Sequence, residues 1–256
     1  MITLNTLEIP HYAKKKTEAF FSELLDIYNY NVHSIYIAGE GLCGDVQRHW
    51  VESIVILQKS DDLFIDVTAR VAKNYLKKPL SPPLIMTIDE IESYIDIFPL
   101  RFLNYNITHQ TIYGFDLFAD LNICHQTLLN QCRLETRNIL NRLINDYIET
   151  GGDRGKIAKK IKKAFRGDIP LFRGLIKLTG VIPPVNHKDV IVALPDVARI
   201  GAGIGAGIGG IGAGIFKTIY EMDTKSGKLP KDFLEKIYDE YYAVINELDK
   251  KLEHSV

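Results

Sequence analysis

The sequence has few cysteines and almost no net charge. Its 256 residues include three cysteines, and the formal net charge is −1 at pH 7. Cys43, Cys124 and Cys132 are odd in number and not paired in spacing, which argues against a disulfide framework or a zinc site and favours a reducing compartment. A net charge near zero provides no overall attraction to nucleic acid or anionic lipid.

The sequence also lacks long hydrophobic runs. Residues 1–16, MITLNTLEIPHYAKKK, contain no apolar core of the kind that a signal peptide needs. We therefore expect a cytoplasmic protein without a membrane span. Hydrophobic residues make up 46% of the chain and charged residues 25%, which is usual for a globular protein.

In the first half, short β-branched runs alternate with amphipathic stretches. The spacing of apolar residues predicts helices over 13–28 and 61–76, and strands over 33–39, 52–58 and 82–86. Thr87 and Glu90 have the spacing of a capping box, which predicts that a helix begins there. The run FPLRFLNYNI, residues 98–107, is strand-like. This alternation predicts a small α/β domain over residues 1–118.

The second half is helical in pattern. Amphipathic stretches predict helices over 121–150, 154–165, 169–179 and 231–252. The first of them stops at Gly151-Gly152. We therefore expect residues 119–256 to form an antiparallel helical bundle behind the α/β domain.

A glycine-rich segment, residues 200–216, lies between the last two predicted helices. Its five isoleucines follow one another at steps of four, four, three and four, which favours a helix with one packed face. Glycine costs about 1 kcal/mol per helical residue relative to alanine, so a flexible loop remains an alternative. The remaining alternatives are contact with a membrane and a phosphate loop. The latter rests on a G-x-G-x-x-G match at Gly205, Gly207 and Gly210, which is weak in so glycine-rich a run.

Residues 35–58, IYIAGEGLCGDVQRHWVESIVILQ, have the pattern of a strand, a glycine-rich turn and a second strand. In this region the chain resembles the nucleotidyltransferase superfamily, and more closely a group of bacterial and archaeal nucleotidyltransferase-domain proteins. Their signature is Gly-Ser, a short turn with Arg-Gly-Asp, and a strand with Ser-Asp-x-Asp. Gly39, Gly44 and Asp45 match it, whereas Glu40 stands at the serine position and Cys43 at the arginine position.

The resemblance extends from about residue 33 to about residue 180. The group has a pattern of an acidic residue, Phe-Pro, Phe-Leu, His and Tyr-Gly-x-Asp, followed by features of a long helix. The matching residues here are Asp96, Phe98, Pro99, Phe102, Leu103, His109, Tyr113, Gly114 and Asp116, and then Gln131, Glu135, Arg137, Leu140, Leu143 and Tyr147. The order and spacing of these motifs carry the resemblance.

The resemblance implies a fold, and also a site that has lost its acids. Nucleotidyl transfer uses two Mg²⁺ ions held by carboxylates, and residues two apart in a strand share a face. The family's two strand acids correspond to Val51 and Ser53, and a third acid is expected near Arg101 and Asn104. None of these residues can replace a carboxylate as a ligand for Mg²⁺. The expected degenerate nucleotide pocket comprises Gly39, Glu40, Gly44, Asp45, Val51, Ser53 and Asn104, with no catalytic residue and no metal ligand.

The expected function is therefore that of a catalytically inactive, nucleotidyltransferase-like module without a cofactor. It would bind or assemble with a protein, a nucleic acid or a second copy of the chain. The alternative is an active enzyme that uses Mg²⁺ and a nucleotide and builds its site from displaced acids. Those acids would be Glu40, Asp45, Glu52 and Asp66.

The predicted helix 154–165 carries a basic face. This face consists of Lys156, Lys159, Lys160, Lys163 and Arg166. It is either a solvated surface of the bundle or a contact for an acidic partner, RNA or a membrane surface. Helical domains of related proteins can act as RNases through an Arg and a nearby His, but no histidine follows Arg166 at that spacing. His109 and His125 have no partners at ligand spacing and are expected to be structural.

Overall fold

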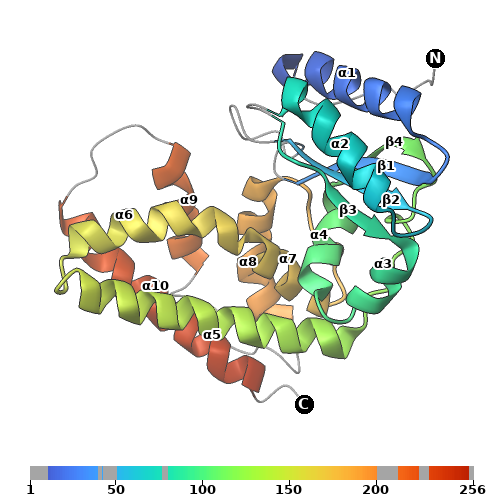
Figure 1. Cartoon of the computed structure of the whole chain (residues 1–256). Coiled ribbons are helices and arrows are strands. Elements are labelled where there is room, and N and C mark those ends of the chain that lie inside the picture. Colours follow the sequence, from blue (N-terminus) through green and yellow to red (C-terminus); the bar gives the residue numbers. More distant parts are fainter. Residues whose placement is uncertain are drawn as a thin grey trace. The chain divides into compact units, whose positions relative to one another are not determined.

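The protein forms two compact units, Met1–Ile123 and Cys124–Val256 (Figure 1). A computed structural model describes residues 11–39, 42, 51–76, 80–200, 213–224 and 231–253. The division expected from the sequence lies at 118/119, whereas the compact units meet at 123/124. The short connector after the last strand of the sheet thus belongs to the first unit.

A mixed four-stranded sheet is the centre of the first unit. Its strands are β1 (Val32–Ala38), β2 (Glu52–Leu57), β3 (Leu84–Thr87) and β4 (Gln110–Gly114), in the order β3-β2-β1-β4. β1 pairs antiparallel with both β2 and β4, and β2 pairs parallel with β3. The sequence analysis predicted a strand on each side of the glycine-rich residues, and the structure shows that these two strands are neighbours in one sheet.

The helices of the first unit cover both faces of the sheet, because each strand alternates its side chains between the faces. Helices α1 (His11–Ile27) and α2 (Asp62–Tyr75) cover one face, where their apolar residues share a core with Val51, Val55 and Leu57. The other face carries Ile54 and Ile56 and packs against α3 (Ile88–Tyr94) and α4 (Pro99–Thr108).

Helix α3 begins with the predicted capping box. The backbone N–H of Glu90 donates to Thr87 Oγ1 at 3.2 Å, and the backbone N–H of Thr87 donates to Glu90 Oε2 at 2.7 Å. These two bonds satisfy donors that a helix start otherwise leaves unpaired. The spacing of two residues in the sequence was therefore sufficient to place this boundary.

Helix α4 corrects the prediction from the sequence, because residues 98–107 were expected to form a strand. Pro99 occupies the first turn, where its missing N–H costs nothing. Phe102 and Tyr105 are three residues apart, share one face of the helix and lie in the same core. The true fourth strand, β4, follows the helix and was not predicted.

The second unit consists of helices and short connections in the part of the chain that is described. Its elements are α5 (His125–Glu149), α6 (Arg154–Phe165), η2 (Arg166–Asp168), α7 (Ile169–Leu178), α8 (His187–Ile200), α9 (Ala213–Thr224) and α10 (Lys231–Glu253). α5 ends where Gly151 and Gly152 adopt positive φ angles of 63° and 78°, a conformation that favours glycine. The antiparallel order of the bundle remains a prediction.

Four aromatic rings form the centre of this unit. Phe172 and Phe216 have ring centroids 5.1 Å apart, and Phe165 and Tyr241 complete the cluster at 5.6 to 6.4 Å. The predictions for the glycine-rich segment fall mostly outside the described residues, which resume at Ala213 with α9. Ile215 of this helix is 2% exposed.

Buried polar groups also join three elements of the second unit. Arg142 of α5 donates through Nη2 to Asp168 Oδ2 at 2.6 Å, and the hydroxyl of Tyr241 in α10 donates to the same oxygen at 3.1 Å. Burial raises the pKa of Asp168, although the Arg142 guanidinium opposes the shift. The carboxyl therefore depends on both donors.

Candidate functional site

The candidate site begins where β1 ends. Gly39 has a φ of 88°, a conformation that glycine adopts without strain. A Cβ atom at this position would lie 3.0 Å from Glu52 Oε2, so the glycine also lets the carboxylate approach the backbone. Glu52 reaches this place because its Cα is paired with that of Ala38, the last residue of β1.

Val51 and Ser53 lie on the other face of the sheet. Val51 is 1% exposed and Ser53 2%, and Val51 belongs to the core beneath α1 and α2. The sequence comparison placed the family's two acids at these positions and expected their side chains to face the pocket beside Gly39. In the structure Glu52 takes that place, because the register Ala38↔Glu52 puts the even-numbered residues of β2 on that side.

Helix α4 supplies the other polar groups near Glu52. Although Glu52 is an exposed residue, burial around its carboxyl raises the pKa of Glu52, and the Arg101 guanidinium opposes this shift. Burial likewise raises the pKa of Tyr105, with Arg101 lowering it and Glu52 raising it. The charges of Glu52 and Arg101 and the Tyr105 hydroxyl therefore influence one another, and Glu52 is the member that lies against Gly39.

The expected pocket also includes Asn104, Glu40, Gly44 and Asp45. Asn104 of α4 donates through Nδ2 to the backbone oxygen of Leu100 at 3.1 Å. Glu40, Gly44 and Asp45 lie outside the described residues. Among the residues that are described, no three His, Cys, Asp or Glu side chains form a group that could hold a metal ion.

The basic face of α6 is partly neutralised. Lys160 Nζ lies 2.9 Å from Asp146 Oδ1 and 2.6 Å from Glu149 Oε2. Lys156 pairs with Asp153 at 3.6 Å within its own first turn. Lys159 and Lys163 are exposed, and Arg166 begins η2. The face therefore presents fewer unpaired charges than the sequence suggests.

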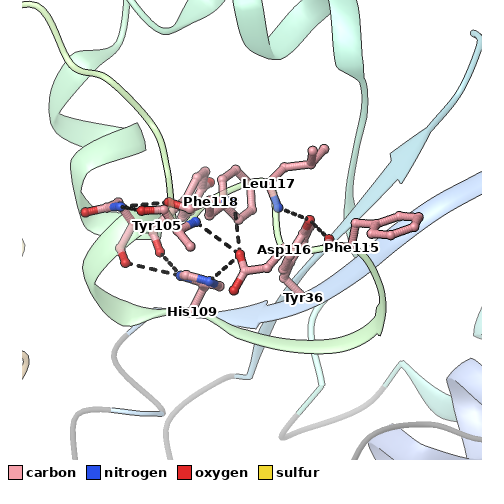
Figure 2. A network of polar contacts seen from close by, with 9 residues as sticks. Tyr36, Tyr105, His109, Phe115, Asp116, Leu117 and Phe118 are labelled. Carbon is pink, nitrogen blue, oxygen red and sulfur yellow. Dashed lines mark hydrogen bonds and ion pairs between the residues drawn. The ribbon is translucent and has the colours of Figure 1, made fainter.

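A second polar group was not predicted from the sequence (Figure 2). His109 Nε2 lies 2.8 Å from Asp116 Oδ1, and His109 Nδ1 lies 2.7 Å from the backbone oxygen of Tyr105. Both ring nitrogens are therefore occupied by groups of the protein, which leaves neither for a substrate. The shared motif of His109, Gly114 and Asp116 was the available signal, but it did not reveal that two of its members are bonded.

Comparisons with known proteins add little. No family model matches the sequence, and no curated protein matches it. Among solved structures, the chain is similar to the crystal structure of spectinomycin adenyltransferase AAD(9) from Enterococcus faecialis with ATP and spectinomycin. The TM-score is 0.49 and the identity 10%, over 95% of this chain and 99% of that chain. A likeness at this level carries no functional inference.

One general property can be stated for the described residues. None of their helices is both long enough and apolar enough to cross a membrane. The candidate site of this protein consists of Glu52, which lies against Gly39, and of Arg101 and Tyr105, which influence it electrostatically. Its possible chemistry is that of these three side chains.

Proposed function

We propose that the first unit is a nucleotidyltransferase-like module that does not catalyse nucleotidyl transfer and instead binds or assembles with another macromolecule. The glycine turn between two antiparallel neighbouring strands and the motifs between residues 33 and 180 support the likeness to that superfamily. The observation that carries the loss of catalysis is the composition of β2, which contains one acidic residue, Glu52, and therefore has an acid on one face and none on the other.

Two-metal phosphoryl chemistry needs carboxylates that point into the same space. One face of β2 offers Glu52 followed by Ile54, which is 1% exposed in an apolar core. The opposite face offers Val51 and Ser53. The described residues therefore do not fit a two-metal site, and no step of the reaction is assigned to them.

The alternative is an active enzyme that uses displaced acids. Glu52 supports it by its place beside Gly39. Asp66 does not, because α2 lies over the face of the sheet opposite to Glu52. An active site would therefore have to combine Glu52 with Glu40 or Asp45.

A direct test measures nucleotide binding and transfer with the full chain. Calorimetry with Mg²⁺ and a nonhydrolysable ATP analogue is expected to show no metal-dependent binding. Incubation with each α-labelled nucleoside triphosphate, alone and with cell extract, is expected to leave no labelled product. Transfer by the wild-type chain that disappears in Glu52→Gln would establish the alternative.

A restoration experiment tests the position of the lost acid. Ile54→Asp places a second carboxylate on the face of Glu52, so we expect a gain in Mn²⁺ affinity, measured by paramagnetic relaxation. Ile54 and Ser53 are both buried, so either change should lower stability. Ser53→Asp is the matched control, because it places the same group on the opposite face of the sheet and should bring no gain in Mn²⁺ affinity. A gain in Ser53→Asp but not in Ile54→Asp would contradict the register-based assignment.

Partners of the second unit are proposed from the exposed part of its basic face. Lys159 and Lys163 are one helical turn apart and both exposed. Single-stranded RNA is a suitable probe, because neutralised phosphates make affinity depend steeply on salt. We expect the double variant Lys159→Glu, Lys163→Glu to abolish salt-dependent binding of this RNA. If the salt dependence of RNA affinity were the same in the variant and the wild type, Lys159 and Lys163 would not contact RNA, and this surface would be only a solvated face.

A further inference from the structure

Helix α5, the long helix of the second unit (Figure 1), has apolar side chains on two faces. The face toward the core of the unit carries the buried residues Leu128, Leu129, Cys132, Thr136, Ile139, Leu140 and Leu143. On the opposite face Leu134, Ile144 and Ile148 are exposed, and Ile148 is 70% exposed. A surface helix of a globular protein usually has a single apolar stripe, because its other face meets water. The second stripe of α5 therefore indicates a surface that is covered by another molecule.

The exposed side of α5 is also poor in charge. Apart from Tyr147, which packs against Tyr238 of α10, the exposed residues from 134 to 148 are Leu134, Arg137, Asn138, Asn141, Ile144, Asn145 and Ile148, and we call these seven residues the outer face of α5. Three of them are asparagines and one is charged. Arg137 Nη2 lies 2.5 Å from Asp249 Oδ2 and 2.9 Å from Glu253 Oε1, so α10 partly neutralises it. Depletion of charge is typical of the centre of a protein–protein interface.

The seven residues of the outer face are spaced symmetrically about Asn141. They lie three, four and seven residues before it and after it, and these steps place side chains on one side of a helix. Leu134 and Ile148 form the two ends of the face, about 21 Å apart along the helix axis. Both ends are apolar and the middle is polar. The outer face can therefore meet a second copy of itself that runs in the opposite direction.

The charge on the outer face favours this antiparallel arrangement. In two antiparallel copies centred on Asn141, Arg137 of one copy lies opposite Asn145 of the other, so the two guanidinium groups lie on different sides of the two-fold axis. In a parallel arrangement Arg137 would lie opposite Arg137, and like charges that face each other repel. An acidic or a basic partner would find little to attract it here, whereas a second copy brings a face of the same low charge.

We propose that the protein forms a dimer through the outer faces of two α5 helices, packed antiparallel about a two-fold axis at Asn141. Leu134 of each copy packs against Ile148 of the other, which removes these exposed apolar side chains from water. At the axis the two Asn141 amides bond to each other, since an amide both donates and accepts. A polar residue in an otherwise apolar helix contact fixes its register. The dimer lies on the second unit and does not depend on the candidate site of the first.

Sedimentation velocity of the full chain, over about two decades of protein concentration, tests for the dimer. We expect a reversible equilibrium between monomer and dimer, because the proposed contact is small. Ile148→Lys should weaken dimerisation by at least about tenfold, because it replaces an apolar contact with a charge. A wild-type chain that is monomeric at every concentration would overturn the proposal and leave the outer face to a partner of another sequence.

A control variant separates this contact from a general effect of surface charge. Lys177 is exposed on α7, outside the outer face of α5, and Lys177→Glu should leave the equilibrium unchanged. Because Ile148 is exposed, Ile148→Lys should keep the circular dichroism spectrum and the unfolding midpoint of the wild type. Equal weakening of the dimer in Lys177→Glu and Ile148→Lys would overturn the proposal.

The residue at the two-fold axis can be identified by mixing two variants. Asn141→Glu and Asn141→Lys should each weaken the dimer, because like charges then meet at the axis. An equimolar mixture of the two should form a heterodimer, because opposite charges then meet there. Variants that dimerise as well as the wild type, or that fail to pair when mixed, would show that Asn141 does not face itself and would overturn the proposal.

These measurements use the chain without nucleotide or Mg²⁺, so their outcome is separate from the test for nucleotidyl transfer. A labelled transfer product would contradict the loss of catalysis and would say nothing against the dimer. A monomeric wild-type chain would contradict the dimer and would say nothing against the loss of catalysis.

Discussion

Gly114 allows β4 to lie against β1. Its φ is 76°, and a Cβ atom there would lie 2.0 Å from the backbone oxygen of His33. We expect Gly114→Ala to lower the free energy of unfolding of the first unit by more than about 3 kcal/mol, because the clash is with backbone. Gly151→Ala is the control: its φ is 63° with nothing within 4 Å, so it should cost about 1–2 kcal/mol. Equal losses in urea unfolding would contradict the clash.

The carboxylate of Asp61 makes the stability of the fold depend on pH in the acid range. Its Oδ1 accepts from the backbone N–H of Leu63 at 3.0 Å and so caps α2. The hydrogen bond from the Tyr28 hydroxyl, followed by weaker contributions from the backbone and Asn31, lowers the pKa of Asp61 against the effect of burial. A lowered pKa stabilises the fold above the unfolded value of about 3.9, and this contribution is lost as pH falls through the folded value.

We therefore expect the stability of the Asp61→Asn variant to fall less steeply than that of the wild type as the pH is lowered. Asparagine caps a helix nearly as well as aspartate, so the variant should fold at neutral pH. The difference in unfolding midpoint between the wild type and the variant should shrink as pH falls below about 4. A difference that stays constant down to pH values of about 2 would show that Asp61 does not titrate with folding.

At the scale of elements, the group of Arg142, Asp168 and Tyr241 joins α5, η2 and α10. Asp168→Ala should lower the free energy of unfolding of the second unit by about 2–3 kcal/mol, because it leaves a guanidinium and a buried hydroxyl without their acceptor. Asp168→Asn keeps an acceptor and should cost less.

The same group makes a pH prediction of opposite sign to that for Asp61. The folded pKa of Asp168 is raised, so its titration favours the folded state at low pH and this contribution is lost as pH rises through the folded value. The stability of the wild type relative to Asp168→Asn should therefore decline as pH rises above about 4. A relative stability that rises with pH would show that the Arg142 pair outweighs burial.

Elements with a clear local signal could be predicted from the sequence. The capping box of α3 and the glycine end of α5 are set by neighbouring residues, and both were located. Residues 98–107 were misassigned because the apolar pattern from Phe98 to Tyr105 suits a strand as well as a helix. Packing of Phe102 and Tyr105 into one core decided between them.

In the candidate site, too, the sequence pattern alone could not determine the structure, because contacts between distant residues decide it. The turn at Gly39 was located correctly, but an alignment shifted by one residue moves every side chain of β2 to the other face. Only the pairing of Ala38 with Glu52 fixes which residues face the turn. The bond between His109 and Asp116 depends on how the end of α4 and the segment after β4 meet, which no local pattern encodes.

At the scale of the whole molecule, the boundary between the units can be tested by truncation. Leu121 and Ile123 are partly buried and pack against the core that contains Phe118. A chain that ends at residue 123 should therefore unfold at a higher urea concentration than one that ends at residue 118. Each of the two side chains is expected to contribute about 1–2 kcal/mol. Equal midpoints by circular dichroism would place the boundary at 118.

The strand order has a consequence for the nascent chain. β1 lies inside the sheet, with β2 on one side and β4 on the other, yet β4 is the last strand to be synthesised. Until the ribosome has released residues 110–114, one edge of β1 and its apolar run Ile35–Ala38 have no partner strand. An unpaired apolar edge invites pairing with other chains. Chaperones are therefore expected to engage this protein during translation of α2 to α4, before the sheet can close.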